Sequence, residues 1–302
     1  MIDQITTMYY DLNIIDELLI GFKNNEIPDD LLLDQLVLRL DDIAKINDYE
    51  ETKKQLILEI IANINISQDT KHKELYLELT KVYDLWTIEG KYGFTLLQMM
   101  CYNGNDMYYD ILNNLTKHKK LWEKQHPQGG NTALHMLILT CKNQHNDIFG
   151  SIVKKLTKYP ELWIIPNDSN TTAMHELCQY KNDIIFDILD EFSDYHSVTL
   201  WEKKDSESMT PLHYLCIHKP NDENKNKYAS LIKKLTQFEN VWSMRDKFMY
   251  TPLHFLTRNF TGSVYEKIFD RLDKSPTLWN IRNAIRRNES DGCGTMVCTG
   301  TT

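Results

Sequence analysis

The chain has 302 residues, of which 42% are hydrophobic, so it is long enough to bury the core of one large domain or two ordinary ones. Its formal net charge of −9 argues against nucleic acid and anionic membranes as partners, because both attract basic patches. No run approaches the roughly 18 consecutive apolar residues of a membrane span, and the acidic N-terminus is unlike a secretory signal peptide. Six scattered cysteines are typical of a reduced protein, so we expect an intracellular localisation.

The first 70 residues lack the motif that repeats in the rest of the chain, and their apolar residues follow a helical spacing. The densest apolar run, DDLLLDQLVLRLDDI, begins directly after Pro28. We predict three helices in this region, at about 5–22, 28–46 and 50–65. The following segment, 71–84, has the pattern of the second helix of an incomplete first repeat.

A four-residue motif then recurs along the chain. It begins at Thr132 (TALH), Thr172 (TAMH), Thr210 (TPLH) and Thr251 (TPLH), with a degenerate copy, TLLQ, at Thr95. The successive spacings are 37, 40, 38 and 41 residues. Self-similarity at such a period is typical of stacked helical repeats.

All the tryptophans share one position in this repeat. Each follows Leu or Val, and the first five stand nine or ten residues before the next motif: Trp86, Trp122, Trp163, Trp201, Trp242 and Trp279. Between motif and tryptophan, apolar residues three and four apart predict a second helix. The unit we predict is therefore a turn, a short helix starting near the Thr, a loop, a second helix, and an apolar extended pair that contains the Trp.

This pattern resembles the ankyrin repeat family, whose signature is a Thr-Pro-Leu-His start, two antiparallel helices and a hairpin finger. The resemblance implies an all-α fold, an ankyrin-type helical repeat solenoid with an N-terminal helical cap region. The units are longer than the family norm of about 33 residues. The domains we expect are a helical region at 1–70, about five ankyrin-like repeats of roughly 37–41 residues at 71–285, and a disordered tail at 286–302.

Two residues before each Thr, the ankyrin family prefers a glycine in a left-handed turn. This chain has Gly93, Gly130, Asn170, Ser208 and Met249 at that position. Gly and Asn adopt positive φ readily, whereas Met does not. We therefore expect Met249 to fit this position only if the turn changes shape.

The histidines of the motif, His135, His175, His213 and His254, allow a metal-site interpretation. The family geometry places them one per repeat, too far apart to share one zinc ion, whose ligands lie about 2 Å away. In ankyrin repeats this histidine hydrogen-bonds the turn backbone between repeats. We therefore expect a structural role and no bound metal.

The tryptophans and motif cysteines also have two interpretations. The tryptophans occupy the slot of a buried residue in the ankyrin finger, so we expect inter-repeat packing; the alternative is a partly exposed binding stripe. Cys101, Cys178 and Cys216 each lie six residues after a motif Thr. The family usually has Ala there, and Cys acts as a small buried apolar residue, so we expect neither a nucleophile nor a metal ligand.

We expect the chain to bind another protein and to be monomeric. Solenoids present an extended concave surface of inner helices and finger tips, and aromatic residues and Arg are typical anchors at interfaces. The residues that vary between repeats predict the following partner-binding set: Tyr180, Tyr214, Arg245, Phe248, Met249 and Phe255. No phosphate loop, zinc ligand set or nucleophile elbow is present, so we expect no enzyme activity and no cofactor.

Two alternatives concern the N-terminal region. Residues 26–45 resemble the opening helix of an F-box, which would make the chain an adaptor that recruits a ubiquitin ligase. A lesser alternative is an enzyme with an unrecognised N-terminal active site. Richness in Lys, Asn, Ile and Asp, together with long repeats, is similar to ankyrin effectors secreted by intracellular bacterial pathogens. That resemblance implies a eukaryotic host protein as the partner and translocation into the host cytoplasm.

Overall fold

The computed structural model describes residues 77, 80–81, 83–90, 92–144, 147–179, 183–194, 197–217 and 223–259. The chain forms two compact units, Met1–Gln128 (unit 1) and Gly129–Thr302 (unit 2). The described part of both units is helical and contains isolated β-bridges but no strand, which confirms the all-α prediction at the level of secondary structure. Several predicted features lie outside the described residues: the helices at 5–22, 28–46 and 50–65, the F-box-like segment 26–45, the tail, and the domain boundaries at 70 and 285.

In unit 2 the described helices follow a recurring order of first helix, second helix and short third helix. They are α8 (Ala133–Gln144), α9 (Asp147–Leu156), η3 (Pro160–Ile164), α10 (Ala173–Cys178), α11 (Asp183–Glu191), α12 (Val198–Trp201), α13 (Pro211–Ile217), α14 (Lys225–Leu235), α15 (Glu239–Ser243) and α16 (Pro252–Asn259). Helices α13 and α16 begin at Pro, which suits the first helical position because no amide hydrogen is needed there.

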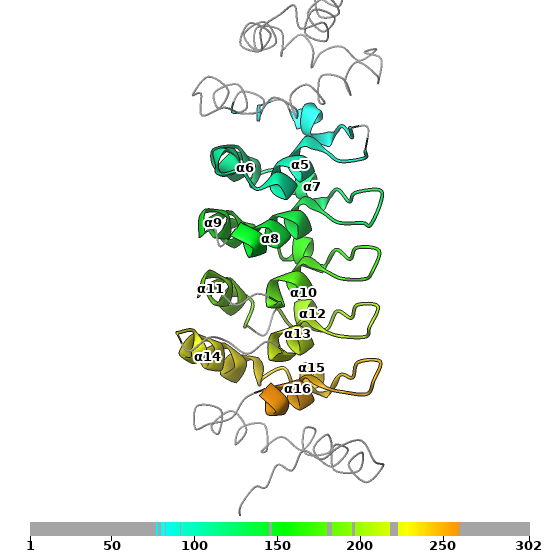
Figure 1. The fold of residues 1–302 in the computed structure, drawn as a ribbon, viewed down its shortest axis with the longest axis vertical. Helices are drawn as coiled ribbons and strands as arrows, with labels where there is room; N and C mark the ends of the chain where they lie inside the picture. The colour runs from blue at the N-terminus through cyan, green and yellow to red at the C-terminus, as the bar shows by residue number, and fades with distance from the viewer. Residues whose placement is uncertain are drawn as a thin grey trace, which may run out of the picture. The chain divides into compact units, whose positions relative to one another are not determined.

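The first helices of unit 2 pack in sequence, α8 on α10, α10 on α13 and α13 on α16. The second helices form a parallel layer in which α11 contacts both α9 and α14. The turns that precede α10, α13 and α16 project to the same side of this two-layer stack (Figure 1). Apolar residues three and four apart face the core, as in α14, where Tyr228, Leu231, Ile232 and Leu235 are buried.

Unit 1 contains η1 (Tyr83–Thr87), α5 (Leu96–Asn103), η2 (Asp106–Tyr108), α6 (Tyr109–Leu115) and α7 (Lys119–Glu123). Helix α5 contacts η1 and α6. A capping box starts α5: the Thr95 hydroxyl accepts from the Gln98 amide at 3.2 Å, and the Gln98 side-chain oxygen accepts from the Thr95 amide at 2.9 Å. Gly104, in the left-handed conformation, ends the helix.

The prediction that each Trp lies in an extended pair was wrong. Trp86, Trp122, Trp163, Trp201 and Trp242 lie in the short helices η1, α7, η3, α12 and α15, and all five rings are buried. This additional helical turn is one reason that the units are long. Trp279 lies outside the described residues.

A buried indole N–H needs an acceptor, and each short helix places its Trp beside one. The Nε1–H groups of Trp122, Trp163 and Trp242 donate to the carbonyl seven residues earlier, at 3.0, 3.1 and 2.9 Å. That carbonyl belongs to the last residue of the preceding second helix, whose final carbonyls have no intrahelical partner. Trp201 donates instead to the carbonyl of Phe192, at 2.9 Å.

Candidate functional site

The motif histidines connect consecutive repeats of unit 2. The Nδ1 atoms of His135, His175 and His213 accept from the amide of the Thr three residues earlier, at 3.2, 3.1 and 3.0 Å. Nε2 therefore carries the proton. It donates to a backbone carbonyl of the following turn, in Thr171, Met209 and Tyr250 respectively, at 3.1, 3.1 and 3.2 Å. The rings thus act as neutral cross-links between a helix start and the next turn.

Burial shifts these histidines toward the neutral form, because an imidazolium would lose its hydration. It lowers the pKa of His135 to about 4, and it also lowers the pKa of His175. The pKa of His213 is lowered to about 4 by burial and, to a smaller extent, by the Lys204 charge. The pKa of His254 is likewise about 4, again mainly through burial, with a contribution from Arg245.

The turns before α10, α13 and α16 are each held by one side-chain oxygen. The Oδ1 atoms of Asn167, Asp205 and Asp246 each accept two backbone amides, from the residues two and four positions later, at 2.8 to 3.0 Å. We did not predict these hydrogen bonds from the sequence, although an Asn or Asp five residues before the motif Thr indicates them. These two hydrogen bonds fix the backbone of the turn, whichever residues stand at its end.

Met249 adopts the left-handed conformation that Gly usually occupies. Its φ is 69°, close to the values of 55° at Asn170, 59° at Ser208 and 69° at Gly130. The expectation that Met249 fits only if the turn changes shape was therefore wrong. The two hydrogen bonds to Asp246 Oδ1 hold the backbone in the same conformation as in the other turns. This conformation is strained for a Met residue.

Backbone hydrogen bonds also join successive turns of unit 2. The Asp168 amide donates to the Gly129 carbonyl at 3.0 Å, and the Ser206 amide donates to the Ser169 carbonyl at 2.9 Å. The Lys247 amide likewise donates to the Glu207 carbonyl at 2.9 Å, and the side chains of these two residues also form an ion pair. The turns therefore form one connected row, so a side chain at the end of a turn is held in a defined place.

Large apolar side chains are exposed at the end of the last described turn. Phe248, Met249 and Tyr250, which we call the apolar tip, are exposed by 66, 52 and 44%. The Lys247 ammonium lies 5.0 Å from the centre of the Phe248 ring, within cation–π distance. Phe248 and Met249 were predicted partner-binding residues, and Tyr250 was not.

The other predicted partner-binding residues differ in their exposure and in their hydrogen bonds. Phe255 is half-buried, and its ring lies 5.9 Å from that of Tyr250, so it continues the apolar tip onto α16. Tyr214 is also half-buried, but its hydroxyl donates to Asp205 Oδ2 at 2.6 Å. Burial and this carboxylate raise the pKa of Tyr214. Arg245 is half-buried just before the last turn, and Tyr180 lies outside the described residues.

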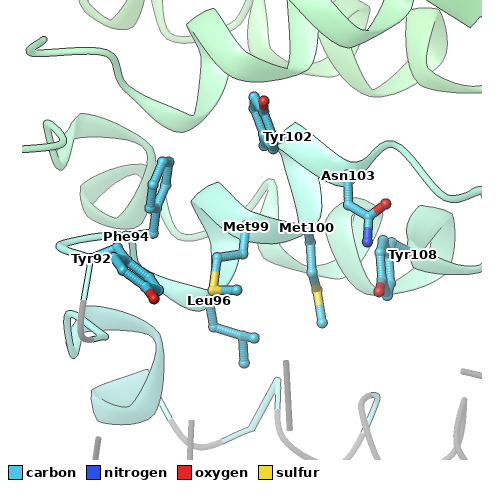
Figure 2. A pocket seen from close by; sticks show the side chains of 8 residues that line it. All are labelled: Tyr92, Phe94, Leu96, Met99, Met100, Tyr102, Asn103 and Tyr108. Carbon is cyan, nitrogen blue, oxygen red and sulfur yellow. The ribbon is translucent and has the colours of Figure 1, made fainter. Parts of the chain in front are cut away.

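A second group of exposed apolar residues lies in unit 1, around a pocket of about 370 Å³. Asn103 and Tyr108 lie at one end, Tyr92 and Phe94 at the other, and Met99 between them (Figure 2). The ring of Phe94 lies tilted against that of His126, with 3.9 Å between the centroids. Hydrogen bonds fix His126, whose Nε2 lies 3.0 Å from the Tyr92 carbonyl.

The buried cysteines among the described residues are poorly suited to nucleophilic chemistry. Cys101, Cys178 and Cys216 are buried thiols. Burial raises the pKa of Cys178 and of Cys216 well above the usual range, so both are protonated at neutral pH. In the part of the chain that the structure describes, no three His, Cys, Asp or Glu residues are grouped so that they could hold a metal ion.

None of the described helices has both the length and the apolar character to cross a bilayer. No protein-family model matches the chain, and no curated protein matches it significantly.

Proposed function

We propose that this chain is an ankyrin-type repeat protein that binds another protein through the apolar tip and the adjoining α16. The recurring helix groups, the Thr–His cross-links and the connected row of turns support the ankyrin interpretation, because together they form a rigid frame with variable ends. Such frames present extended binding surfaces.

The left-handed conformation of Met249 is the observation that supports the proposal most directly. Placing a residue with a Cβ in this conformation costs about 1–2 kcal/mol. The equivalent positions in unit 2 are occupied by Gly130, Asn170 and Ser208, which are small or adopt positive φ more readily. Because Met249 is about half exposed, burial within the chain offsets this cost only in part. A contact with a partner is a reason to keep a large apolar side chain there.

The neighbouring side chains extend this argument from one residue to a surface. Tyr250 and Phe248 flank Met249, and the Tyr250 ring lies edge-on to His254 and tilted against Phe255. Clustered aromatic residues on a rigid support are typical of the central part of protein interfaces. The resemblance to secreted bacterial ankyrin effectors makes a eukaryotic host protein the partner that we propose.

The experiment compares partner capture with stability. Tagged full-length protein, a Phe248→Ser/Met249→Gly variant and a matched Ser206→Ala/Ser208→Gly variant of the preceding turn are incubated with eukaryotic cytosol. Quantitative mass spectrometry measures the captured proteins, and thermal melting measures stability.

The proposal predicts that wild type and the matched control capture the same protein and that the Phe248/Met249 variant loses it. The melting temperature of that variant should be unchanged or higher, because Gly relieves the left-handed strain. A lower melting temperature together with intact capture would show that the apolar tip serves the fold and not a partner.

A further inference from the structure

We infer that residues 280–288 dock on the open side of α16, the side that bears His254, and on the last described turn, as the next turn of the same row. These residues lie outside the described part of the chain. Their docking is an interaction within the chain and is separate from the proposed partner contact. The docked turn sets one edge of the surface that a partner can reach.

The open side of α16 is less covered than the equivalent side of the preceding first helices. The motif histidines of α8, α10 and α13 are fully buried, whereas His254 of α16 is half-buried. Leu253 retains 7% exposure, against 0% for Leu212, its equivalent in α13. Each earlier first helix is covered here by the turn and helix that follow it, and among the described residues nothing takes that place on α16.

His254 has a hydrogen-bond donor without an acceptor among the described residues. Its Nδ1 accepts from the Thr251 amide at 3.0 Å, as in the other motif histidines, so Nε2 carries the proton. In the three earlier repeats of unit 2, Nε2 donates to the carbonyl four residues after the Asn or Asp that holds the next turn. A half-buried donor gains free energy from an acceptor, and the repeat specifies where that acceptor belongs.

Residues 280–288 have the spacings of such a turn. Asn283 stands four residues after Trp279, as the Asn or Asp of the turns before α10, α13 and α16 stands four residues after its own tryptophan. Asn288 follows Asn283 by five residues, which is the separation of those Asn and Asp residues from the motif Thr. The motif Thr is a helix N-cap, as at Thr172, and Asn is among the residues preferred there.

The contacts between the described turns define how this segment docks. The residue after the Asn or Asp of one turn donates its amide to the carbonyl two residues after the Asn or Asp of the preceding turn. This bond is 2.9 Å long in two pairs, Ser206 with Ser169 and Lys247 with Glu207. Continued by one turn, the register pairs the Ala284 amide with the Phe248 carbonyl. The register of the motif histidines pairs the Arg287 carbonyl with His254 Nε2.

The test combines amide hydrogen exchange of the full-length protein, followed by mass spectrometry, with NMR of the imidazole Nε2–H protons. We expect the amides of residues 283–288 to exchange at least about tenfold more slowly than in a free peptide of the same sequence. We also expect a slowly exchanging Nε2–H signal from His254, assigned by its loss in His254→Gln, beside the signals of the three buried motif histidines.

Variants of the segment test the predicted register. Asn283→Ala should bring the exchange of residues 283–288 to within about twofold of the free peptide and remove the His254 signal, because the turn loses the oxygen that holds it. Asn283→Asp should retain both, since Asp holds the turns before α13 and α16. Asn280→Ala changes the same residue type outside the conserved spacing, so it is the matched control and should change neither.

Exchange of residues 283–288 at the rate of the free peptide in the wild-type chain would overturn the inference, whatever the variants do. A His254 signal that persists unchanged in Asn283→Ala would overturn it too. If the signal appears only at high protein concentration, the open side of α16 binds a second copy of the chain, and docking of 280–288 is refuted. All these measurements are made without a partner, so none of these outcomes refutes the proposed function, which is tested by Phe248-dependent capture.

Discussion

Replacing Trp163 with alanine tests the internal frame on which the turns are built. The Trp163 side chain is fully buried, its Nε1–H donates to the Leu156 carbonyl at 3.1 Å, and its ring lies edge-on to Phe192 with centroids 4.8 Å apart. Loss of a buried aromatic side chain costs about 3–5 kcal/mol, and a buried carbonyl without its donor costs about 1–3 kcal/mol.

These costs overlap, so we expect Trp163→Ala to lower the free energy of unfolding by about 4–6 kcal/mol. That is a large part of the roughly 5–15 kcal/mol by which domains are stable. The melting temperature should fall by about 10–20 °C. Trp163→Phe keeps most of the apolar contact and removes the donor, so we expect a loss of about 1–3 kcal/mol.

The assay is urea unfolding and thermal melting followed by far-UV circular dichroism, with exposed Ser169→Ala as the control within about 0.5 kcal/mol of wild type. Circular dichroism is preferred because the substitution removes a fluorophore. If Trp163→Ala unfolds at the same urea concentration as wild type, the tryptophans are not core residues and the frame described above is incorrect.

Further expectations concern pH, strain and thiol reactivity. Because the pKa values of His135 and His213 are about 4 in the folded chain, against about 6.5 when unfolded, the unfolded state binds more protons between these values. Stability should therefore fall as the pH drops from about 6.5 to 4, by on the order of 3 kcal/mol for each histidine; a flat profile in urea titrations over this range would contradict the burial of the rings. Met249→Gly should raise stability by about 0.5–1 kcal/mol, since relief of left-handed strain exceeds the added entropy of the unfolded chain; a destabilised variant in the same titration would show that the Met side chain packs within the fold. Native protein treated with iodoacetamide should leave Cys178 and Cys216 unmodified until it unfolds, as mass mapping would show, and rapid labelling without unfolding would refute their burial.

The spacing of the tryptophans was visible in the sequence, but the short helices that hold them were not. A helix of four or five residues is too short to show a 3.6-residue period. Its stability comes from burying the ring and satisfying the indole N–H, as in the Trp242 contact with the Leu235 carbonyl. Both are tertiary effects, so local pattern reasoning predicted an extended pair.

Only part of the candidate site was predictable from the sequence, because some of its features also depend on tertiary contacts. The apolar residues Phe248 and Met249 stood out because they replace the small or polar residues of the other turns. Their backbone conformation was not predictable from residue preference, since two hydrogen bonds to Asp246 outweigh the preference of Met for negative φ. The hydroxyl bond of Tyr214 to Asp205 joins two residues that sequence spacing alone does not pair.

The central claim is that the apolar tip contacts another protein, and site-specific photo-cross-linking tests it most directly. A photoreactive phenylalanine replaces Phe248 in one protein and exposed Ser169 in a control, and both are irradiated in eukaryotic cytosol. Our account predicts one protein cross-linked from position 248 and not from position 169, competed by excess wild-type chain. Equal labelling from both positions, or no cross-link from position 248, would contradict it.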